Sequence, residues 1–337
     1  MKILYGIQGT GNGHISRARM MARHFQDQAA DVTYLLTGRE KDKLFDRDIF
    51  GDLRNCRGLT FSTKNGSIDH IQTALNNNIF KFIYDVYKLD VEQFDLVLTD
   101  FEPVTAWAAR FSNVPSIAFG HQYAFDHAIP KDGVDLAGKI IMSSFTPAKI
   151  RIGLHWDHFG FDILPPIVDP DLGRIDSDTE YTVVYLPFEN QHRVTQLLQT
   201  IKDHRFIQYS PDLIDSEAGN VSLRQTSLHG FRHDLCGAQG VICNAGFELV
   251  SECLFIGVPV LVKPLKGQME QQSNALALTQ LNYGSVMSTI DTTLIRQWLS
   301  QRQLTDGIRF GNVAAALVKW ILGGQVDDIG QLKRHLW

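Results

Sequence analysis

Short apolar runs alternate with longer amphipathic stretches along this 337-residue chain, and the pattern occurs in both halves. In the first half we expect strands at 2–7, 31–37, 94–100 and 115–120 and helices at 15–28, 71–88 and 104–111. In the second half we expect strands at 181–187, 205–210, 240–245 and 258–264 and helices at 247–255, 292–303 and 308–322. Such alternation is typical of parallel sheets covered by helices. The sequence therefore predicts an α/β fold with two tandem Rossmann-like, doubly wound domains.

A proline-rich segment, DILPPIVDPDL at 162–172, separates the two halves. Proline disfavours regular structure, so this segment predicts a linker. We expect an N-terminal domain at 1–160, a linker at 161–173 and a C-terminal domain at 174–337, whose last helix packs back onto the first domain. Ligands of open parallel sheets bind at the carboxyl ends of the strands, so the strand-to-helix loops of both domains should face a cleft between them.

The composition narrows the class of protein. Hydrophobic residues make up 44% and charged residues 20%, which is typical of a globular protein. A net charge of -5 gives no basic footprint for nucleic acid. Without a run of 18 apolar residues, and with a strand starting directly after Met1, we expect a cytoplasmic protein. The four cysteines match neither metal spacing nor a disulfide scaffold, so we expect free thiols.

The stretch GIQGTGNGHISRA at 6–18 follows the first expected strand. Gly11 and Gly13 would let the backbone turn tightly and approach a ligand or the other domain. A dinucleotide-binding loop would continue to a third glycine in the helix, and an acidic residue would close the second strand. Here His14 stands at the helix entrance and the second strand ends in LLTG at 35–38. We therefore expect no nicotinamide cofactor.

His14 is a candidate general base, because an imidazole that is neutral at cellular pH can accept a proton from a hydroxyl. It could instead only cap or pack the helix start. A base of this kind needs a carboxylate to orient it, and Asp100 or Glu102 could do so from the end of the strand at 94–100. Asp100 could equally cap the next helix. His121 and Gln122, in FGHQYAFDH, suit recognition of a hydroxylated substrate or belong to an ordinary polar loop.

The stretch VICNAGFELVSECLF at 241–255 contains a second strand, turn and helix. The free amides and partial positive charge of a helix N-terminus favour a phosphate there. Glu252 lies about one and a half turns into this helix, where a carboxylate could take both hydroxyls of a ribose, or simply be solvated. Three polar side chains at the next helix start could bind the hydroxyls of a sugar or form an ordinary first turn: Glu270, Gln271 and Asn274.

Together these motifs resemble the donor site of GT-B glycosyltransferases, especially the lipid-intermediate N-acetylglucosaminyltransferase of peptidoglycan synthesis and the plant UDP-glycosyltransferases. In the plant enzymes a His-Cys-Gly-Trp-Asn-Ser stretch precedes a ribose-binding Glu, and residues 244–249 precede Glu252 at the same spacing. The family's acidic-or-Gln plus Gln pair matches Glu270-Gln271, and the following asparagine of the peptidoglycan enzyme matches Asn274.

The resemblance implies transfer of a sugar from a nucleotide diphosphate sugar, UDP-linked in these relatives, to an acceptor hydroxyl with inversion. The family's glycine-rich turn ending in Gly-His matches 11–14, so His14 would be the base, and of its two possible partners we favour Glu102. Gly11, Gly13, His121 and Gln122 would lie on the acceptor side. The donor-binding residues implied are Asn244, Ala245, Gly246, Phe247, Glu252, Glu270, Gln271 and Asn274, with Leu228 as a contact to the nucleobase.

The sequence also departs from the family. Asn244 stands where the plant enzymes have a phosphate-binding histidine, and the loop after 181–187 reads FEN without a glycine, so the diphosphate would depend on backbone amides. Asp169-Pro170-Asp171 resembles the metal-binding Asp-x-Asp of the other glycosyltransferase fold, but in a proline-rich linker we interpret it as a chance match. We expect no metal and no cofactor besides the donor, because helix amides can stabilise a leaving diphosphate.

Two other functions fit the same residues: a nucleotide-sugar epimerase of this fold, and a regulatory protein that binds a nucleotide sugar without turning it over. The acceptor could be a glycan, a lipid-linked molecule or a small molecule, and the oligomeric state is open. Arg17, Arg19 and Arg23, with Ile150-Arg151-Ile152, could make a peripheral contact with the inner face of the cytoplasmic membrane. The same arginines could simply form a solvated helix face.

Overall fold

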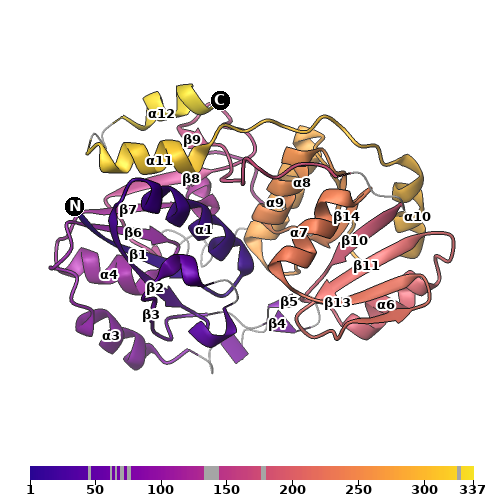
Figure 1. Ribbon diagram of the computed structural model, residues 1–337, viewed down its shortest axis with the longest axis horizontal. Coiled ribbons are helices and arrows are strands. Elements are labelled where there is room, and N and C mark those ends of the chain that lie inside the picture. Colours follow the sequence, from indigo (N-terminus) through magenta and orange to yellow (C-terminus); the bar gives the residue numbers. More distant parts are fainter. Residues whose placement is uncertain are drawn as a thin grey trace.

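The computed structural model describes residues 1–44, 47–60, 63–64, 67–68, 72–73, 77–132, 144–175, 180–324 and 328–337. Two seven-stranded sheets lie side by side, each flanked by helices (Figure 1). The predicted fold class, α/β with two tandem doubly wound domains, is confirmed.

The N-terminal sheet is parallel throughout. Its strands, in spatial order, are β3 (Arg54–Asn55), β2 (Asp31–Thr37), β1 (Lys2–Gln8), β6 (Leu96–Asp100), β7 (Ser116–Gly120), β8 (Ile150–Leu154) and β9 (Ile163–Leu164). Its helical elements are α1 (Asn12–Asp27), η1 (Lys41–Lys43), η2 (Asp48–Phe50), α3 (Ile79–Lys88), α4 (Pro103–Phe111) and η3 (His121–Asp126). A separate antiparallel pair is formed by β4 (Thr63–Lys64) and β5 (Ser67–Ile68).

The C-terminal sheet is parallel except at one edge, where β12 runs against β13. Its strands, in spatial order, are β12 (Ser216–Ala218), β13 (Val221–Gln225), β11 (Arg205–Ser210), β10 (Tyr181–Tyr185), β14 (Val241–Asn244), β15 (Val260–Lys263) and β16 (Ser285–Val286). Its helices are α6 (Gln191–Gln199), α7 (Leu228–Gly237), α8 (Phe247–Ile256), α9 (Met269–Leu281) and α10 (Thr292–Gln301).

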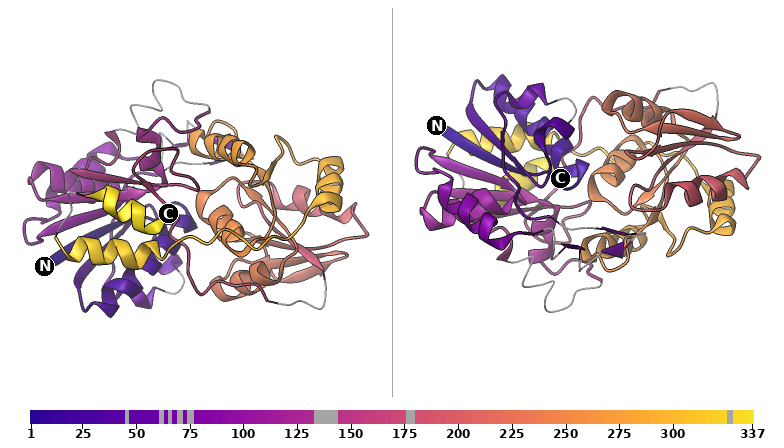
Figure 2. Two further views of the ribbon diagram at one scale, coloured as in Figure 1. Left: turned by 90° about the horizontal axis from the view of Figure 1, so that it is seen from above. Right: turned by 90° about the horizontal axis from the view of Figure 1, so that it is seen from below.

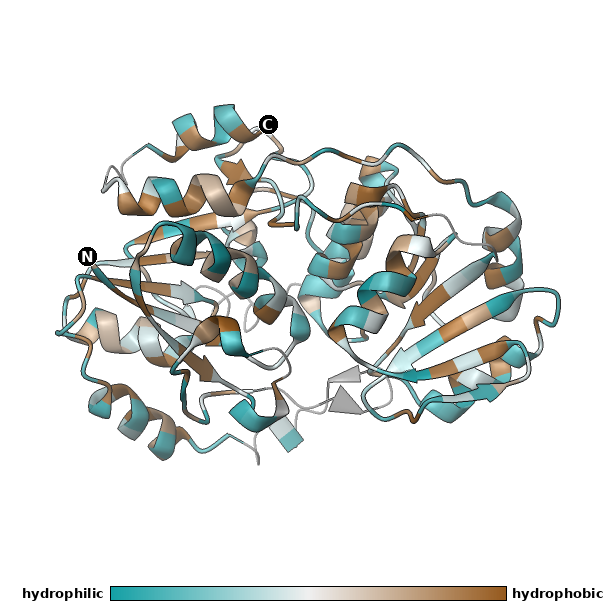
Figure 3. Ribbon diagram, viewed as in Figure 1, coloured by the Kyte–Doolittle hydropathy of each residue, from teal (hydrophilic) through white to brown (hydrophobic). Residues whose placement is uncertain are grey.

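The chain ends by crossing back to the first domain. Helices α11 (Val313–Leu322) and α12 (Ile329–Leu336) follow α10, yet α11 contacts α1 and α12 contacts β9. Figure 2 shows both helices, in yellow, against the N-terminal domain from two sides. The Trp337 indole donates to the Ile163 carbonyl at 2.8 Å. Helix α11 is largely hydrophobic (Figure 3), as expected of a helix that buries one face on a neighbour.

The strands are buried because helices cover both faces of each sheet, and parallel sheets of this kind are built from nearly continuous apolar runs. In β1 all residues after Lys2 are buried, and β7 is buried along its whole length. This pattern explains why the strand positions could be predicted closely: β2 matches its predicted bounds, and β11 does as well.

The structure differs from the expected elements at four places. Helix α1 begins at Asn12, three residues before the predicted start, so His14 lies in its first turn. The proline-rich segment is not free of regular structure, because Ile163–Leu164 pair with β8 before the prolines. Residues 150–154 form β8, a strand with neighbours on both sides, which the sequence analysis did not predict. The predicted helix at 71–88 is seen as Ile79–Lys88, and its residues 71 and 74–76 lie outside the described residues.

Candidate functional site

The register of the N-terminal sheet brings the first glycine loop beside the end of β6. Ile7 of β1 lies opposite Asp100, the last residue of β6. Phe101, the next residue, has a φ of 53°, a left-handed conformation that non-glycine residues rarely adopt. Such backbone strain is often found at functional sites. The turn aims the Asp100 carboxylate back toward the first turn of α1.

Asp100, and not Glu102, is the partner of His14. Nδ1 of His14 lies 2.7 Å from Oδ1 of Asp100. The His14 side chain keeps 15% of its surface exposed, whereas that of Asp100 is fully buried. The Phe101 ring stacks nearly parallel to the imidazole, at 9° and 6.4 Å between centroids. This is the geometry of a histidine oriented by a carboxylate at one nitrogen, with the other nitrogen left for a substrate.

The preference for Glu102 is therefore wrong, and the reason is helix capping. Glu102 is the N-cap of α4, where its carboxylate accepts from the amides of Val104 and Thr105 at 2.7 Å each. Pro103 occupies the first helical position, which fits its fixed φ and missing N–H. Burial raises the pKa of the Glu102 carboxyl, and these hydrogen bonds only partly offset that effect. The role considered for Asp100, capping the next helix, belongs to Glu102.

Arg17 was not predicted to belong to the site, but it joins the two domains there. Its Nε and Nη2 donate to Oδ2 and Oδ1 of Asp100 at 2.8 and 2.5 Å. Its Nη1 donates to Glu248, in the first turn of α8. Burial raises the pKa of Asp100, but Arg17 and His14 outweigh burial and hold it below the usual value. Asp100 is thus an anion at neutral pH and can stabilise a proton on His14.

His121 and Gln122 also contact the C-terminal domain. Nε2 of His121 lies 2.6 Å from Oδ1 of Asn274, and Gln122 donates to Glu270 at 3.1 Å. Both residues start η3 after β7, so their position at the carboxyl edge follows from the strand order. Oε1 of Gln122 is buried and has no hydrogen-bond partner among the described residues. An unpaired buried acceptor of this kind is costly unless a ligand supplies a donor.

Two of the residues predicted to bind the sugar donor, Asn274 and Phe247, pack between the two domains instead. Asn274 is fully buried, and its Nδ2 donates to the carbonyl of Ala245 while its Oδ1 faces His121, so its amide is not free for a sugar. Phe247 is 1% exposed and stacks on His121 with 3.9 Å between ring centroids. Both expectations are corrected: these side chains build the junction between the domains rather than face a ligand.

The turn before α8 keeps the features expected of an anion site. Gly246 is the N-cap of α8, and no side chain in the described part of the chain caps its first turn. The first amides of a helix need a partner, and an uncapped turn leaves them for a ligand or water. Asn244 donates through Nδ2 to the carbonyl of Lys263 at 3.0 Å, while its Oδ1 is buried without a partner among the described residues.

Glu252 lies in the middle of α8 and is half-buried, and its carboxylate has no hydrogen-bond partner among the described residues. Burial raises its pKa to about 7, Arg232 lowers it, and Glu248 and Asp169 raise it further. Arg232 is itself bound to Asp169 at 2.5 Å. A carboxylate in such a position can be satisfied by two hydroxyl donors from outside the chain.

The remaining predicted residues have mixed surroundings. Oε1 of Gln271 accepts from the amide of Leu265 at 2.9 Å, which shapes the loop between β15 and α9. Leu228 starts α7 and is half-buried. Lys263, which was not predicted, donates to Glu189 of the FEN loop at 2.5 Å and is 8% exposed. This ion pair fixes the glycine-free loop where the resemblance would have a glycine-rich phosphate loop.

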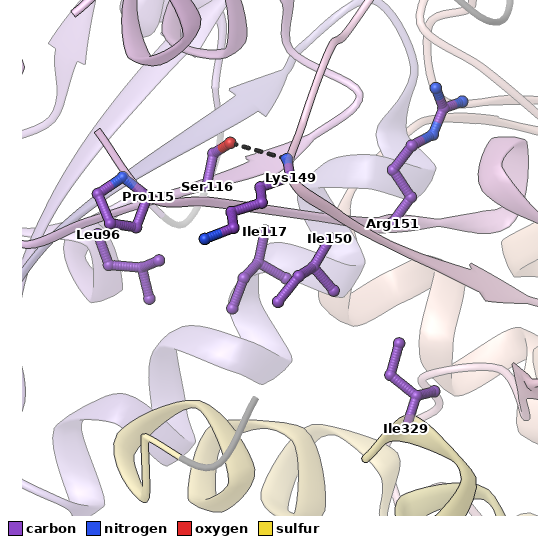
Figure 4. A pocket seen from close by; sticks show the side chains of 8 residues that line it. All are labelled: Leu96, Pro115, Ser116, Ile117, Lys149, Ile150, Arg151 and Ile329. Atoms are coloured by element: carbon purple, nitrogen blue, oxygen red, sulfur yellow. Dashed lines mark hydrogen bonds between the residues drawn. The ribbon is translucent and has the colours of Figure 1, made fainter. Parts of the chain in front are cut away.

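The residues of the predicted membrane contact differ in exposure, and the contact stays a prediction. Arg17 and Arg19 are buried, at 1% and 7% exposure, whereas Arg23 is 48% exposed and pairs with Asp169 at 3.3 Å. A hollow of about 450 Å³ lies at the amino ends of β6, β7 and β8, facing Ile329 of α12 (Figure 4). It is at the opposite edge of the sheet from His14. No helix in the described part of the chain is long and apolar enough to cross a membrane.

Among the described residues, no three His, Cys, Asp or Glu side chains are grouped to hold a metal ion, and Asp169 is engaged with Arg23 and Arg232.

Two residues with contacts across the domains, Asn12 and Arg17, were not predicted. Asn12 donates to the Tyr185 hydroxyl at 3.3 Å. A signal for Arg17 was available: an arginine three residues after His14 lies on the same face of a helix.

Comparison with known proteins agrees with this architecture. The family model described as Glycosyl transferase family 1 matches residues 1–302. A comparison with curated protein sequences found no match.

Several solved structures share the fold. The glycotransferase of kitacinnamycin has 15% identity and a TM-score of 0.61, covering 99% of this chain and 95% of its own. MurG of Acinetobacter baumannii has 15% identity and a TM-score of 0.54, covering 89% and 90%. VinC, in complex with dTDP, has 13% identity and a TM-score of 0.55, covering 99% and 100%. At this identity the likeness shows the fold alone, and it confirms the GT-B architecture.

Proposed function

This chain belongs to glycosyl transferase family 1 and is a glycosyltransferase, and on that premise we propose that it moves a sugar from a UDP-linked donor to an acceptor hydroxyl with inversion at the anomeric carbon. The observation that carries the proposal is the conjunction of an oriented histidine on one domain with an uncapped helix N-terminus and an unpaired Glu252 on the other. The contacts of Arg17, His121 and Gln122 bring these two halves together.

The donor would lie along α8. The diphosphate binds the amides after Gly246, where the partial positive charge of the helix compensates its charge. Glu252, further along the same helix, accepts the hydroxyls of the ribose. Glu270 and the unpaired Oε1 of Gln122 lie at the other end of this row, where they would bind hydroxyls of the sugar. The bound nucleotide of VinC supports a pyrimidine nucleoside diphosphate as the leaving group.

The chemical step is a single displacement. The acceptor hydroxyl attacks the anomeric carbon and gives its proton to Nε2 of His14, while Asp100 holds the proton on Nδ1. The bond from the anomeric carbon to the diphosphate oxygen breaks, and its electron pair stays on the phosphate. The amides at the start of α8 stabilise that developing charge. Attack opposite the leaving group inverts the anomeric configuration.

The first test is thermal stabilisation by nucleotides. We expect UDP, and UDP-sugars, to raise the melting temperature of the wild-type protein, because a ligand that binds only the native state stabilises it. Glu252→Ala should abolish most of this shift. Glu217→Ala, which removes an exposed carboxylate from the same domain, should keep it. No shift with UDP or dTDP would contradict the donor site.

The products separate this function from its two rivals. Incubation with UDP-sugar and an acceptor panel should release UDP and a glycosylated product. Conversion of the donor to an isomer without UDP release would indicate an epimerase. Binding with neither transfer nor hydrolysis would indicate a regulatory protein.

A further inference from the structure

One guanidinium connects the candidate base to the other domain. Arg17 is bidentate to Asp100 through Nε and Nη2, and its Nη1 donates to Glu248 of α8. The Arg17 side chain is 1% exposed and that of Glu248 is 21% exposed. Asp100 and Arg17 belong to the N-terminal domain, whereas Glu248 belongs to the C-terminal domain. The contact with Glu248 therefore exists only while α8 lies against α1.

Gly13 makes room for this contact. A Cβ at Gly13 would overlap Oε2 of Glu248, so any side chain there would push the carboxylate away from Arg17. Gly11, two residues earlier in the same loop, has no atom within 4 Å of such a Cβ. Of these two glycines, therefore, only Gly13 lies against Glu248 of the other domain.

The proton on His14 can sit on either nitrogen. Nδ1 lies 2.7 Å from Oδ1 of Asp100, which can only accept, and 2.9 Å from Nη2 of Arg17, which can only donate. If Nδ1 carries the proton, it donates to Asp100 and Nε2 is free to accept a proton from a substrate. If Nδ1 accepts from Arg17, Nε2 carries the proton and His14 cannot act as a base.

We propose that Arg17 is a positioning residue through which closure of the domains selects the active tautomer of His14. Glu248 draws Arg17 toward α8, so that Nη2 stays on Asp100 and Asp100 keeps the proton on Nδ1. When the domains separate, Arg17 loses Glu248, and Nη2, which already lies 2.9 Å from Nδ1 of His14, donates to Nδ1 instead of to Asp100. This inference rests on the glycosyl transfer proposed above, in which His14 is the base.

Because the groups around His14 are charged, the coupling through Arg17 should also affect the pH dependence of kcat/KM. Asp100 from β6 and Arg17 from α1 contact His14 directly, and behind them lie Glu248 from α8, bound to Arg17, and the buried phenol of Tyr5 from β1. With His14 neutral these groups carry a net charge of about -1, so accepting a proton neutralises the cluster. Without the Glu248 charge the cluster is already neutral, so no net negative charge stabilises the proton that is transferred from the acceptor.

The first experiment compares Glu248→Gln with Glu217→Gln, a matched control whose carboxylate pairs with Arg224 at 2.7 Å on the surface. UDP release from UDP-glucose or UDP-N-acetylglucosamine is measured against pH. For Glu248→Gln the acid limb of kcat/KM should move down by roughly one pH unit, with kcat falling ~10-fold near pH 7.5 and the donor KM changing less than ~3-fold. A fall in kcat with an unmoved acid limb would overturn the proposal, because it would indicate a purely structural role.

The second experiment does not need activity. Long-range ¹H–¹⁵N spectra of ¹⁵N-histidine-labelled protein report the tautomer of each ring, and His14→Gln assigns the His14 signals. We expect the Nδ1–H tautomer in the wild type and in Gly11→Ala, and a shift toward Nε2–H in Gly13→Ala. Identical His14 spectra in Gly11→Ala and Gly13→Ala, or an Nε2–H wild type, would overturn the coupling. This result stands even if every donor proves inert, an outcome that would contradict the proposed function instead.

Discussion

Among single residues, Glu252 is a candidate ligand contact because its carboxylate lacks a hydrogen-bond partner in the described part of the chain. Its side chain is half-buried on α8, and burial raises the pKa of the carboxyl to about 7 from an ordinary value of 4.5. The folded protein therefore favours the neutral carboxyl. The stability that this preference contributes is complete below pH 4.5 and is lost as the pH rises to about 7. At higher pH the free protein bears the cost of an unpaired charge, which bound hydroxyls would relieve.

Glu252→Gln should therefore be more stable than the wild type at pH 8, by roughly 1–3 kcal/mol, because glutamine has no charge to bury. The difference should disappear near pH 4.5, where both side chains are neutral. Urea unfolding at the two pH values measures it. The same variant should bind UDP more weakly, so stability and affinity move in opposite directions. Equal destabilisation at both pH values would mean that the carboxyl has partners in the free protein.

At the scale of elements, neighbouring carboxylates after β6 have separate tasks. Asp100 ends the strand and binds His14 and Arg17, while Glu102 caps α4. Sequence reasoning identified both residues but exchanged their roles, because two acids separated by one residue satisfy the same pattern. The left-handed backbone of Phe101, between the two acids, determines which of them points toward His14. No local sequence signal predicts that conformation at a phenylalanine.

Glu102→Ala should lower the free energy of unfolding by about 1–2 kcal/mol, the usual cost of losing an N-cap. Glu102→Gln, which retains an acceptor oxygen, should lose less. Denaturant titration measures both, and kcat per folded molecule should stay within ~3-fold of the wild type. Asp100→Asn should instead lower kcat at least ~10²-fold. A large loss of kcat in Glu102→Ala at normal stability would contradict this assignment, because it would indicate that Glu102 takes part in catalysis.

The elements that build the donor side were predictable to different degrees. The strand and turn at 241–246 and the helix that follows were predicted from hydrophobic periodicity and glycine placement. The burial of Phe247 and Asn274 was not, because it depends on His121, which comes from a distant part of the chain. Arg17 was missed although its spacing from His14 places both on one helix face, because a polar helix face that meets another domain has the same sequence pattern as one that meets water.

At the scale of the whole molecule, the last two helices belong in space to the first domain. Leu317 of α11 is fully buried, and α11 contacts α1, the helix that carries His14 and Arg17. The matched family region ends at 302, before these helices begin. The C-terminal segment therefore links the two domains a second time and buttresses the helix that positions the base.

Leu317→Ala should cost about 2–5 kcal/mol of stability, as other buried leucine truncations do. Hydrogen exchange should then rise in α1 while β10 and β11 remain protected. Leu294→Ala, on the exposed side of α10 at 41% exposure, is the matched control and should change stability by less than ~0.5 kcal/mol. Faster exchange in the C-terminal sheet rather than in α1 would show that α11 supports the other domain.

The most direct test of the whole account is UDP release from UDP-glucose and UDP-N-acetylglucosamine with an acceptor panel, comparing the wild type with His14→Ala. An exposed histidine changed in the same way, His192→Ala, serves as the control. We expect a ~10²- to 10⁴-fold lower turnover for His14→Ala, with thermal stabilisation by UDP preserved. Turnover close to that of the wild type would contradict it, because the oriented histidine would then not be the base.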